Sequence, residues 1–141
     1  MQIKKILVPL DGSKNSVRGL DMAIFMARQC GATITGICSV YTPPHSEFRG
    51  IGQVEKSVNE EVKKFMGEAK YKAAKQGVVF RTKIMHGNVG YNILKVAHNK
   101  KDKYDLIVMG SRGRGTVKEL FLGSTSNHVI HASKIPVLLV K

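Results

Sequence analysis

Short apolar segments alternate along this chain with longer segments in which apolar residues recur every three or four positions. The short segments lie at residues 3–9, 33–40, 78–85, 105–109 and 135–140. Their β-branched and apolar content favours β-strands, whereas the longer segments have the spacing of amphipathic helices. Strands that alternate with helices form parallel βαβ units with right-handed crossovers. We therefore predict an α/β fold in which one open parallel sheet carries helices on both faces.

Four helices are predicted between these strands, and single residues mark several of their ends. Gly31 and Gly77 each follow an apolar stripe, in the position where glycine commonly ends a helix. Asn88 is suited to cap the third helix, residues 124–133 form the fourth, and residues 41–52 are expected to be a loop. The stripes of the first three helices are Val17, Leu20, Ile24 and Ala27, then Val54, Val58, Val62, Phe65 and Ala69, and finally Ile93, Val96 and Ala97.

The length and composition of the chain suit one domain spanning residues 1–141. Of the 141 residues 43% are hydrophobic, yet no apolar run approaches the ~18 residues of a membrane-spanning helix. The N-terminus lacks a signal-peptide core, so we expect a cytoplasmic location and no membrane partner. Cys30 and Cys38 are then expected to be reduced thiols in or near the core. Core positions are also expected for Met22, Met26, Met66, Met85 and Met109.

The formal net charge of +13 calls for an explanation. Lysines cluster at residues 63–64, 70–75 and 100–103. One interpretation is a well-solvated surface, and the other is binding to a polyanion or an anionic surface. No segment interleaves aromatic and basic residues in the way that proteins use to stack nucleic-acid bases.

A glycine-rich segment directly follows the predicted strand at residues 105–109. It contains Gly110, Gly113 and Gly115, and a second group, Gly123 to Ser126, precedes the last predicted helix. Glycine lets backbone N–H groups approach an anion closely, and a helix start adds unpaired N–H groups and a positive dipole end. Arg112 and Arg114 add cations whose geometry suits phosphate oxygens, although both are equally well explained as surface residues. The segment therefore predicts a phosphate-binding site.

Two common phosphate-binding motifs do not fit this segment. A P-loop requires Gly-x4-Gly-Lys-Ser/Thr, but Gly110-x4-Gly115 is followed by Thr116. A dinucleotide-binding fingerprint requires Gly-x-Gly-x-x-Gly after the first strand, but Gly113-x-Gly115 is followed by Lys118 after the fourth. The pattern that remains is Gly110-x2-Gly113-x9-Gly123-Ser124.

This remaining pattern resembles the nucleotide-binding signature of the universal stress protein family, in its ATP-binding branch. The resemblance extends to the opening Ile6-Leu7-Val8-Pro9-Leu10-Asp11-Gly12-Ser13 and to the closing Lys134-Ile135-Pro136-Val137-Leu138-Leu139-Val140. It also covers residues 105–111, so it spans nearly the whole chain. The resemblance implies a five-stranded parallel sheet in the order 3-2-1-4-5, Rossmann-like and similar to adenine nucleotide alpha hydrolases.

The resemblance also implies a role for individual residues in binding an adenine nucleotide. Gly110, Gly113, Gly123 and Ser124 would contact phosphates, with Arg112 and Thr125 lining the same site. Asp11 would lie near the ribose or a Mg²⁺ ion bound with ATP, although from the residues alone it is equally a turn former or helix cap. Pro9 would line the nucleoside, the Val40 backbone would read the adenine edge, and Met109 would belong to the same site.

Several functions remain open at this point. The leading hypothesis is a stress-response or signalling module that binds ATP, ADP or AMP. Efficient catalysis is not expected, since no catalytic residue or general base is evident. The alternatives are a weak ATPase, and a protein- or nucleic-acid-interaction module with an incidental pocket. The resemblance implies a homodimer that pairs through the last strand, at Pro136, Val137, Leu138, Leu139 and Val140. The histidines, including His128 and His131, do not form a convincing metal site.

Overall fold

The computed structural model describes the backbone of residues 1–40, 51–112 and 122–141, and the side chains of the same residues except 51–59. Its elements in chain order are β1 (Lys5–Pro9), α1 (Lys14–Cys30), β2 (Thr33–Val40), α2 (Ile51–Lys75), β3 (Phe80–His86), α3 (Val89–Ala97), β4 (Leu106–Gly110), α4 (Ser124–Ala132) and β5 (Val137–Val140). The predicted alternation of strands and helices is confirmed. No helix in the described part of the chain has both the length and the apolarity to cross a membrane.

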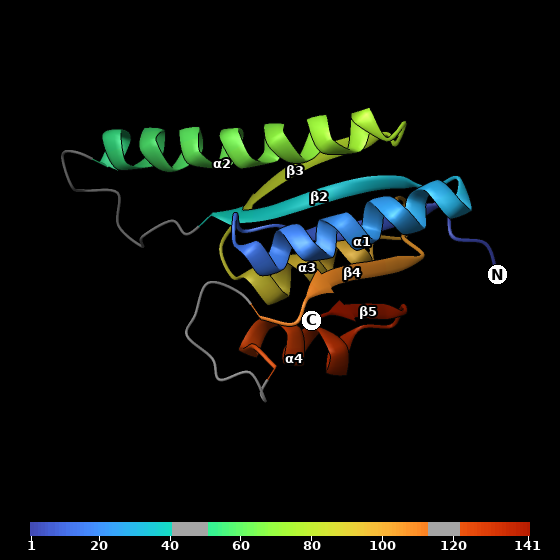
Figure 1. The fold of residues 1–141 in the computed structure, drawn as a ribbon. Helices are drawn as coiled ribbons and strands as arrows, with labels where there is room; N and C mark the ends of the chain where they lie inside the picture. Colours follow the sequence, from blue (N-terminus) through green and yellow to red (C-terminus); the bar gives the residue numbers. More distant parts are fainter. Residues whose placement is uncertain (41–50, 113–121) are drawn as a thin grey trace.

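The five strands form one parallel sheet in the order β3-β2-β1-β4-β5, as predicted (Figure 1). β1 lies at the centre, where Ile6 pairs with Leu106 and Leu7 with Ile107 of β4. The strand order changes direction between β1 and β4, because the chain goes from β1 to β2 on one side and from β4 to β5 on the other. In open α/β sheets the crevice at the carboxyl ends of two such strands is the usual ligand position.

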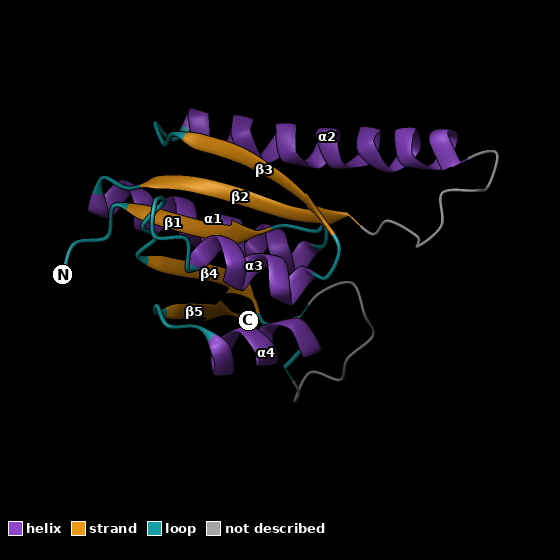
Figure 2. Ribbon diagram, turned by 180° about the vertical axis from the view of Figure 1, so that it is seen from behind, coloured by secondary structure: helices purple, strands orange, loops and turns teal. Residues whose placement is uncertain are grey.

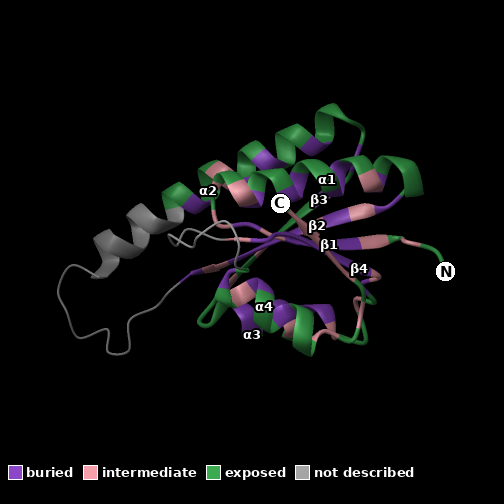
Figure 3. Ribbon diagram, turned by 60° about the horizontal axis from the view of Figure 1, so that its bottom comes forward, coloured by how far each residue is buried: buried purple, intermediate pink, exposed green. Residues whose placement is uncertain are grey.

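Two helical layers enclose the sheet. α1 and α2 cover one face and α3 and α4 cover the other (Figures 2 and 3). The core under α1 and α2 contains the fully buried Ile6, Val8 and Ile34, and the core under α3 and α4 contains Leu7 and Ile107. Neighbouring residues of β1 thus serve opposite faces, which explains why the central strands are continuously apolar.

Element boundaries differ from the prediction at four of the five strands. β1 begins at Lys5 rather than residue 3, and β4 spans Leu106–Gly110 rather than residues 105–109. The differences at the other two strands have identifiable reasons. The third strand begins at Phe80 rather than residue 78, because the Val78 N–H donates to the Ala73 carbonyl and completes the end of α2. Gly77 makes this turn possible at φ +74°. The last strand begins at Val137 rather than residue 135, since Pro136 has no N–H to pair with a neighbouring strand.

Three expected core residues are instead exposed. Val17 and Met22 of α1 are 37% and 38% exposed, and Cys30 is exposed at the end of the same helix. The buried face of α1 consists of Ser16, Gly19, Leu20, Ala23, Ile24 and Ala27. The predicted stripe is confirmed at Leu20, Ile24 and Ala27, and the small residues Ser16, Gly19 and Ala23 complete the face. Cys38 is buried, as expected.

Parts of the prediction fall outside the described residues. These are the loop at residues 41–50, the side chains of Val54 and Val58, and the segment that contains Gly113, Arg114 and Gly115. α2 itself begins at Ile51, inside the range expected to be a loop.

Candidate functional site

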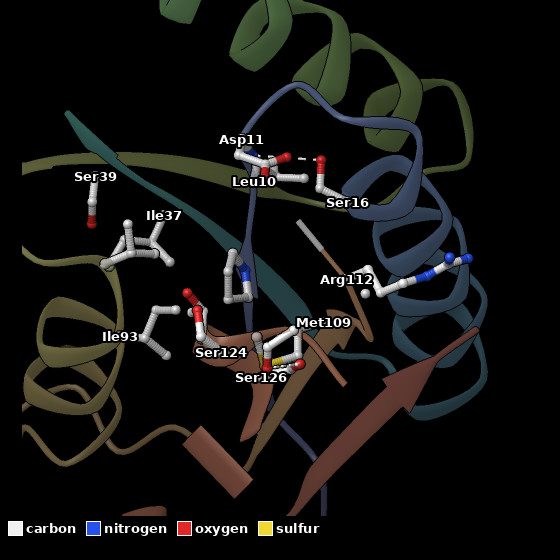
Figure 4. Close-up of a pocket in the computed structure, with 15 residues that line it drawn as sticks. Leu10, Asp11, Ser16, Ile37, Ser39, Ile93, Met109, Arg112, Ser124 and Ser126 are labelled. Atoms are coloured by element: carbon white, nitrogen blue, oxygen red, sulfur yellow. Dashed lines mark hydrogen bonds between the residues drawn. The ribbon is translucent and has the colours of Figure 1, made fainter. Parts of the chain in front are cut away.

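A cavity of about 230 Å³ opens at the carboxyl ends of β1, β2 and β4, beside the start of α4 (Figure 4). Its lining residues are Pro9, Leu10, Asp11, Ser16, Ile37, Ser39, Val89, Ile93, Met109, Gly110, Arg112, Gly123, Ser124, Thr125 and Ser126. The cavity therefore lies at the point where the strand order changes direction.

The lining has an apolar part and a polar part. Ile37, Ile93 and Met109 come from β2, α3 and β4 and give the cavity an apolar wall. The polar part consists of hydroxyl groups and glycine backbone. It includes Ser124 and Thr125, which are the first residues of α4. A cavity of this kind suits a ligand with a flat apolar end and an anionic end.

The start of α4 presents unpaired backbone donors to this cavity. Gly123 is the N-cap residue, and it provides no side-chain cap for the first turn; no such cap is found among the described residues. The Ser126 hydroxyl, which is suited by sequence to cap the helix, instead donates to carbonyl oxygens of Ser111 (2.7 Å) and Gly123 (3.0 Å). The first N–H groups of a helix lack partners within the helix, so those of Ser124 and Thr125 remain available to an anion.

Gly110 has a packing role that is independent of any ligand. A Cβ atom at this position would lie 2.5 Å from the carbonyl oxygen of Asn15 in α1. Gly19 lies one turn further along α1, and a Cβ atom there would lie 3.0 Å from the backbone nitrogen of Gly110. The two glycines let α1 rest directly on the backbone at the end of β4, which holds the end of β4 beside the start of α1.

The turn after β1 fixes Asp11 at the cavity. Its Oδ1 accepts a hydrogen bond of 2.8 Å from the Ser13 N–H, and Gly12 adopts φ +82°. Ser13 in turn caps α1 by accepting from the Ser16 N–H at 3.2 Å. Asp11 is therefore a turn former, Ser13 is the helix cap, and the second carboxylate oxygen of Asp11 has no hydrogen-bond partner among the described residues.

Ser39 is held at the cavity by a buried asparagine. The Asn92 side chain is 3% exposed, and its amide nitrogen lies 3.0 Å from the His86 carbonyl and 3.2 Å from the Ser39 hydroxyl. The carbonyl can only accept, so this atom of Asn92 is the NH₂ group, and it donates to Ser39 as well. The hydroxyl hydrogen of Ser39 is consequently free to donate into the cavity.

Eight of the ten residues predicted for the site line the cavity: Pro9, Asp11, Met109, Gly110, Arg112, Gly123, Ser124 and Thr125. Val40 does not. Its side chain is buried in the core under α1 and α2, and its carbonyl accepts from the Gly87 N–H. Gly113 lies outside the described residues. The Arg112 guanidinium extends away from Ser124 and Ser126 (Figure 4), so a phosphate contact would require this side chain to turn.

Sequence reasoning found Met109 of the apolar wall but missed Ile37, Ile93 and Ser39. Ile37 and Ser39 occupy alternate positions of β2, and alternate residues of a strand point to the same face. The alternation of residues at the carboxyl end of β2 is the signal that indicates both Ile37 and Ser39. Val89 and Ile93 come from α3, whose position depends on tertiary packing. Gly90 of α3 lies so close to His128 of α4 that a Cβ atom at Gly90 would be 2.8 Å from the His128 ring.

Protein side chains alone do not assemble a metal centre in the described regions. No group of three or more His, Cys, Asp or Glu residues there could hold an ion. Asp11 is the carboxylate that lines the cavity, so a cation at this position would need ligands from a bound molecule.

Comparison with known proteins gives consistent matches along the chain. The model of the universal stress protein family matches residues 2–141. The universal stress protein YxiE of Bacillus subtilis is 36% identical, with 97% of this chain and 98% of that protein covered. The universal stress protein MJ0531 of Methanocaldococcus jannaschii is 32% identical, with 98% and 82% covered.

Solved structures share the same fold. The structure of MJ0577 from Methanocaldococcus jannaschii matches with a TM-score of 0.86 and 27% identity, covering 100% of this chain and 97% of that one. A universal stress protein in complex with cAMP has a TM-score of 0.78 at 23% identity, covering 100% and 99%. The universal stress protein from Archaeoglobus fulgidus in complex with dAMP has a TM-score of 0.70 at 20% identity, covering 100% of both chains.

Proposed function

Because the chain belongs to the universal stress protein family, we propose that it binds an adenine nucleotide in the cavity between β1, β4 and α4. The observation that carries this proposal is the start of α4, which offers uncapped N–H groups beside an apolar wall. The base would lie against Ile37 and Ile93, and the phosphates would lie at Gly123 to Thr125. Structural relatives bound to cAMP and dAMP support this class of ligand.

We propose ATP with Mg²⁺ as the physiological ligand. The helix dipole of α4 and its free N–H groups stabilise negative charge, and this stabilisation favours a polyphosphate over an uncharged nucleoside. The phosphates would supply most of the ligands of the cation, and Asp11 would supply one more through its second oxygen. The domain would act as a stress-response or signalling module in the cytoplasm.

Ser39 gives the site a means to recognise the base. Its hydroxyl accepts from the Asn92 amide, which leaves the hydroxyl hydrogen free to donate into the cavity. Every unsubstituted ring nitrogen of adenine that is not bonded to the ribose accepts hydrogen bonds, whereas guanine carries a hydrogen on one of them, N1. A donor at Ser39 therefore favours adenine wherever it faces that edge of the base.

Calorimetric titration with ATP, with and without Mg²⁺, tests the proposal. Gly123→Val places a branched side chain at the N-cap and should abolish measurable binding. Gly67→Val is the matched control, because a Cβ at Gly67 in α2 meets no atom within 4 Å. Equal affinities for wild type and Gly123→Val would show that the nucleotide binds elsewhere.

A weak ATPase is the second use that this cavity could serve. Asp11 is the carboxylate among the lining residues, so turnover would depend on it. Magnesium-dependent phosphate release that disappears in Asp11→Ala, with ATP still bound, would assign hydrolysis to this protein. Stoichiometric binding without turnover would leave a passive nucleotide-binding module.

We also propose a homodimer that pairs through β5. This strand lies at the edge of the sheet, and its four residues are all only partly buried. Pro136 and Val140 use their carbonyls to accept from Ile107 and Ser111 of the same chain. Alternate residues of a strand bond to opposite sides, so the backbone groups of Val137 and Leu139 face outward and can pair with a second copy.

A further inference from the structure

A second groove lies at the opposite, amino-terminal ends of the strands. It measures about 330 Å³ and is lined by Lys5, Thr33, Thr35, Arg81, Thr82, Lys83, Asp102 and Tyr104. Tyr104 belongs to the core under α3 and α4, which places the groove on that face of the sheet. Figure 2 shows β2 and β3 running past α3 with no helix in front of them.

The charges in this groove are predominantly positive. Lys5, Arg81 and Lys83 contribute three cations against one carboxylate, that of Asp102, which leaves two positive charges in excess. Further lysines at residues 100, 101 and 103 adjoin it in sequence, and the Asp105 carboxylate is occupied by the N–H groups of Lys4 and Lys5. The groove therefore attracts anions.

The two cations on β3 are not held by an anionic partner in the part of the chain that the structure describes. Neither Arg81 nor Lys83 makes a hydrogen bond or ion pair among the described residues. On the opposite layer Lys72 pairs with Asp21 at 2.7 Å. Lys5 keeps its position by donating to the Asp102 carbonyl at 2.8 Å. The groove thus holds a fixed cation beside two that are free to bind.

Hydroxyl groups complete the set of donors. Thr33 and Thr35 lie on β2, where Thr33 pairs with Lys5 of β1 and Thr35 pairs with Arg81 of β3. The side chain of Tyr104 forms a hydrogen bond with that of Thr35, and burial raises the pKa of Tyr104, so its hydroxyl stays protonated. A planar guanidinium, ammonium groups and hydroxyls together are the donor set that phosphate oxygens require.

We propose that this groove binds a dianionic phosphate group, at a site separate from the nucleotide cavity. Two excess positive charges match a dianion, and the open face of β2 and β3 gives it access. The ligand is a free phosphate or the end of an inorganic polyphosphate chain. Base recognition plays no part, because the groove has no aromatic ring other than that of the buried Tyr104.

Residue-resolved NMR titration with inorganic tripolyphosphate, repeated with orthophosphate, tests this site. The backbone amide signals of residues 33–35 and 81–83 are expected to shift. Signals of residues 123–126 report separately on binding at the nucleotide cavity. The double variant Arg81→Gln with Lys83→Gln should weaken tripolyphosphate binding at the groove about tenfold.

The matched control removes two lysines from another surface. Lys63→Gln with Lys64→Gln makes the same change of charge on the exposed side of α2 and should alter the affinity less than about twofold. Equal weakening by both double variants would replace the site with diffuse attraction to the whole surface. Shifts confined to residues 123–126 would also overturn the proposal. So would shifts at the groove with single-stranded RNA but not with tripolyphosphate. If the double variant does not fold, Arg81→Gln alone provides the comparison.

Discussion

Gly110 and Asn15 approach each other so closely that any side chain at Gly110 would collide with the backbone of α1. Its Cβ would lie 2.5 Å from the Asn15 carbonyl oxygen and 2.8 Å from the carbonyl carbon. Backbone cannot move aside as a flexible side chain can. This contact sets the end of β4 beside the start of α1, and both edges of the nucleotide cavity depend on it.

Gly110→Ala should therefore destabilise the fold, whether or not a ligand is present. Overpacking at a rigid contact costs about 1–3 kcal/mol or more in the free energy of unfolding. Gly67→Ala is the control, since it meets open space within a helix and should stabilise by about 0.5–1 kcal/mol. Urea unfolding of the two variants measures both effects. A Gly110→Ala protein as stable as wild type would refute the packing role.

Ser39→Ala should reduce the preference for adenine. Loss of one hydrogen bond costs about 1 kcal/mol, so the affinity for ATP should fall about fivefold. The affinity for GTP should change less, because Ser39 donates where guanine carries its own hydrogen. Ser39→Thr keeps the hydroxyl and should retain the preference. Competition binding with ATP and GTP measures the ratio, and an unchanged ratio in Ser39→Ala would remove Ser39 from base recognition.

Tyr104 should make stability depend on pH at the alkaline end. Burial raises its pKa in the folded protein above the ordinary value near 10. The folded state then holds the proton more tightly than the unfolded state, so this contribution is complete below about pH 10 and is lost as pH rises towards the folded pKa. The Tyr104→Phe variant has no hydroxyl at this position and therefore does not lose stability in this way.

The measurement for Tyr104 is the difference in unfolding free energy between wild type and Tyr104→Phe from pH 7 to 11. Contributions common to both proteins cancel in the difference. At neutral pH the free energy of unfolding of wild type should exceed that of Tyr104→Phe by about 1 kcal/mol, because wild type has the hydrogen bond to Thr35. This difference in free energy of unfolding should shrink above pH 10, and a constant difference would contradict the raised pKa of Tyr104.

The edge strand gives a prediction about assembly. Leu139→Pro removes an outward N–H without removing a bond to β4, and should convert the proposed dimer to a monomer. Leu139→Ala loses the side chain but keeps the N–H, and should remain dimeric. Light scattering with size exclusion separates these outcomes. A monomeric wild type, or a dimer that survives in Leu139→Pro, would exclude pairing through β5.

The sequence predicted the architecture well because its signals are local. The apolar run at Ile107 and Val108, the glycine after α1 and the cap at Asn88 each act within a few residues, and the structure confirms them. The strand order came from family resemblance, since local patterns do not determine which strands are neighbours.

The site was predicted less completely, for reasons of packing. Gly110 was found through a phosphate pattern, yet its collision with Asn15 arises between segments far apart in the chain. Ser39 depends on Asn92, 53 residues away, and on the carbonyl of His86. Val17 and Met22 look apolar in sequence, but the face of α1 that packs on β4 uses Gly19 instead. Such relationships become visible only when the elements are assembled.

The central claim is that the first turn of α4 holds the phosphates of an adenine nucleotide. Backbone amide shifts on titration with adenosine, AMP and ATP test it most directly. Adenosine should shift the signals of residues 37–39, and each added phosphate should enlarge the shifts at Ser124 and Thr125. If ATP binds while the amides of Ser124 and Thr125 respond no more to it than to adenosine, the phosphates lie elsewhere and the claim is wrong.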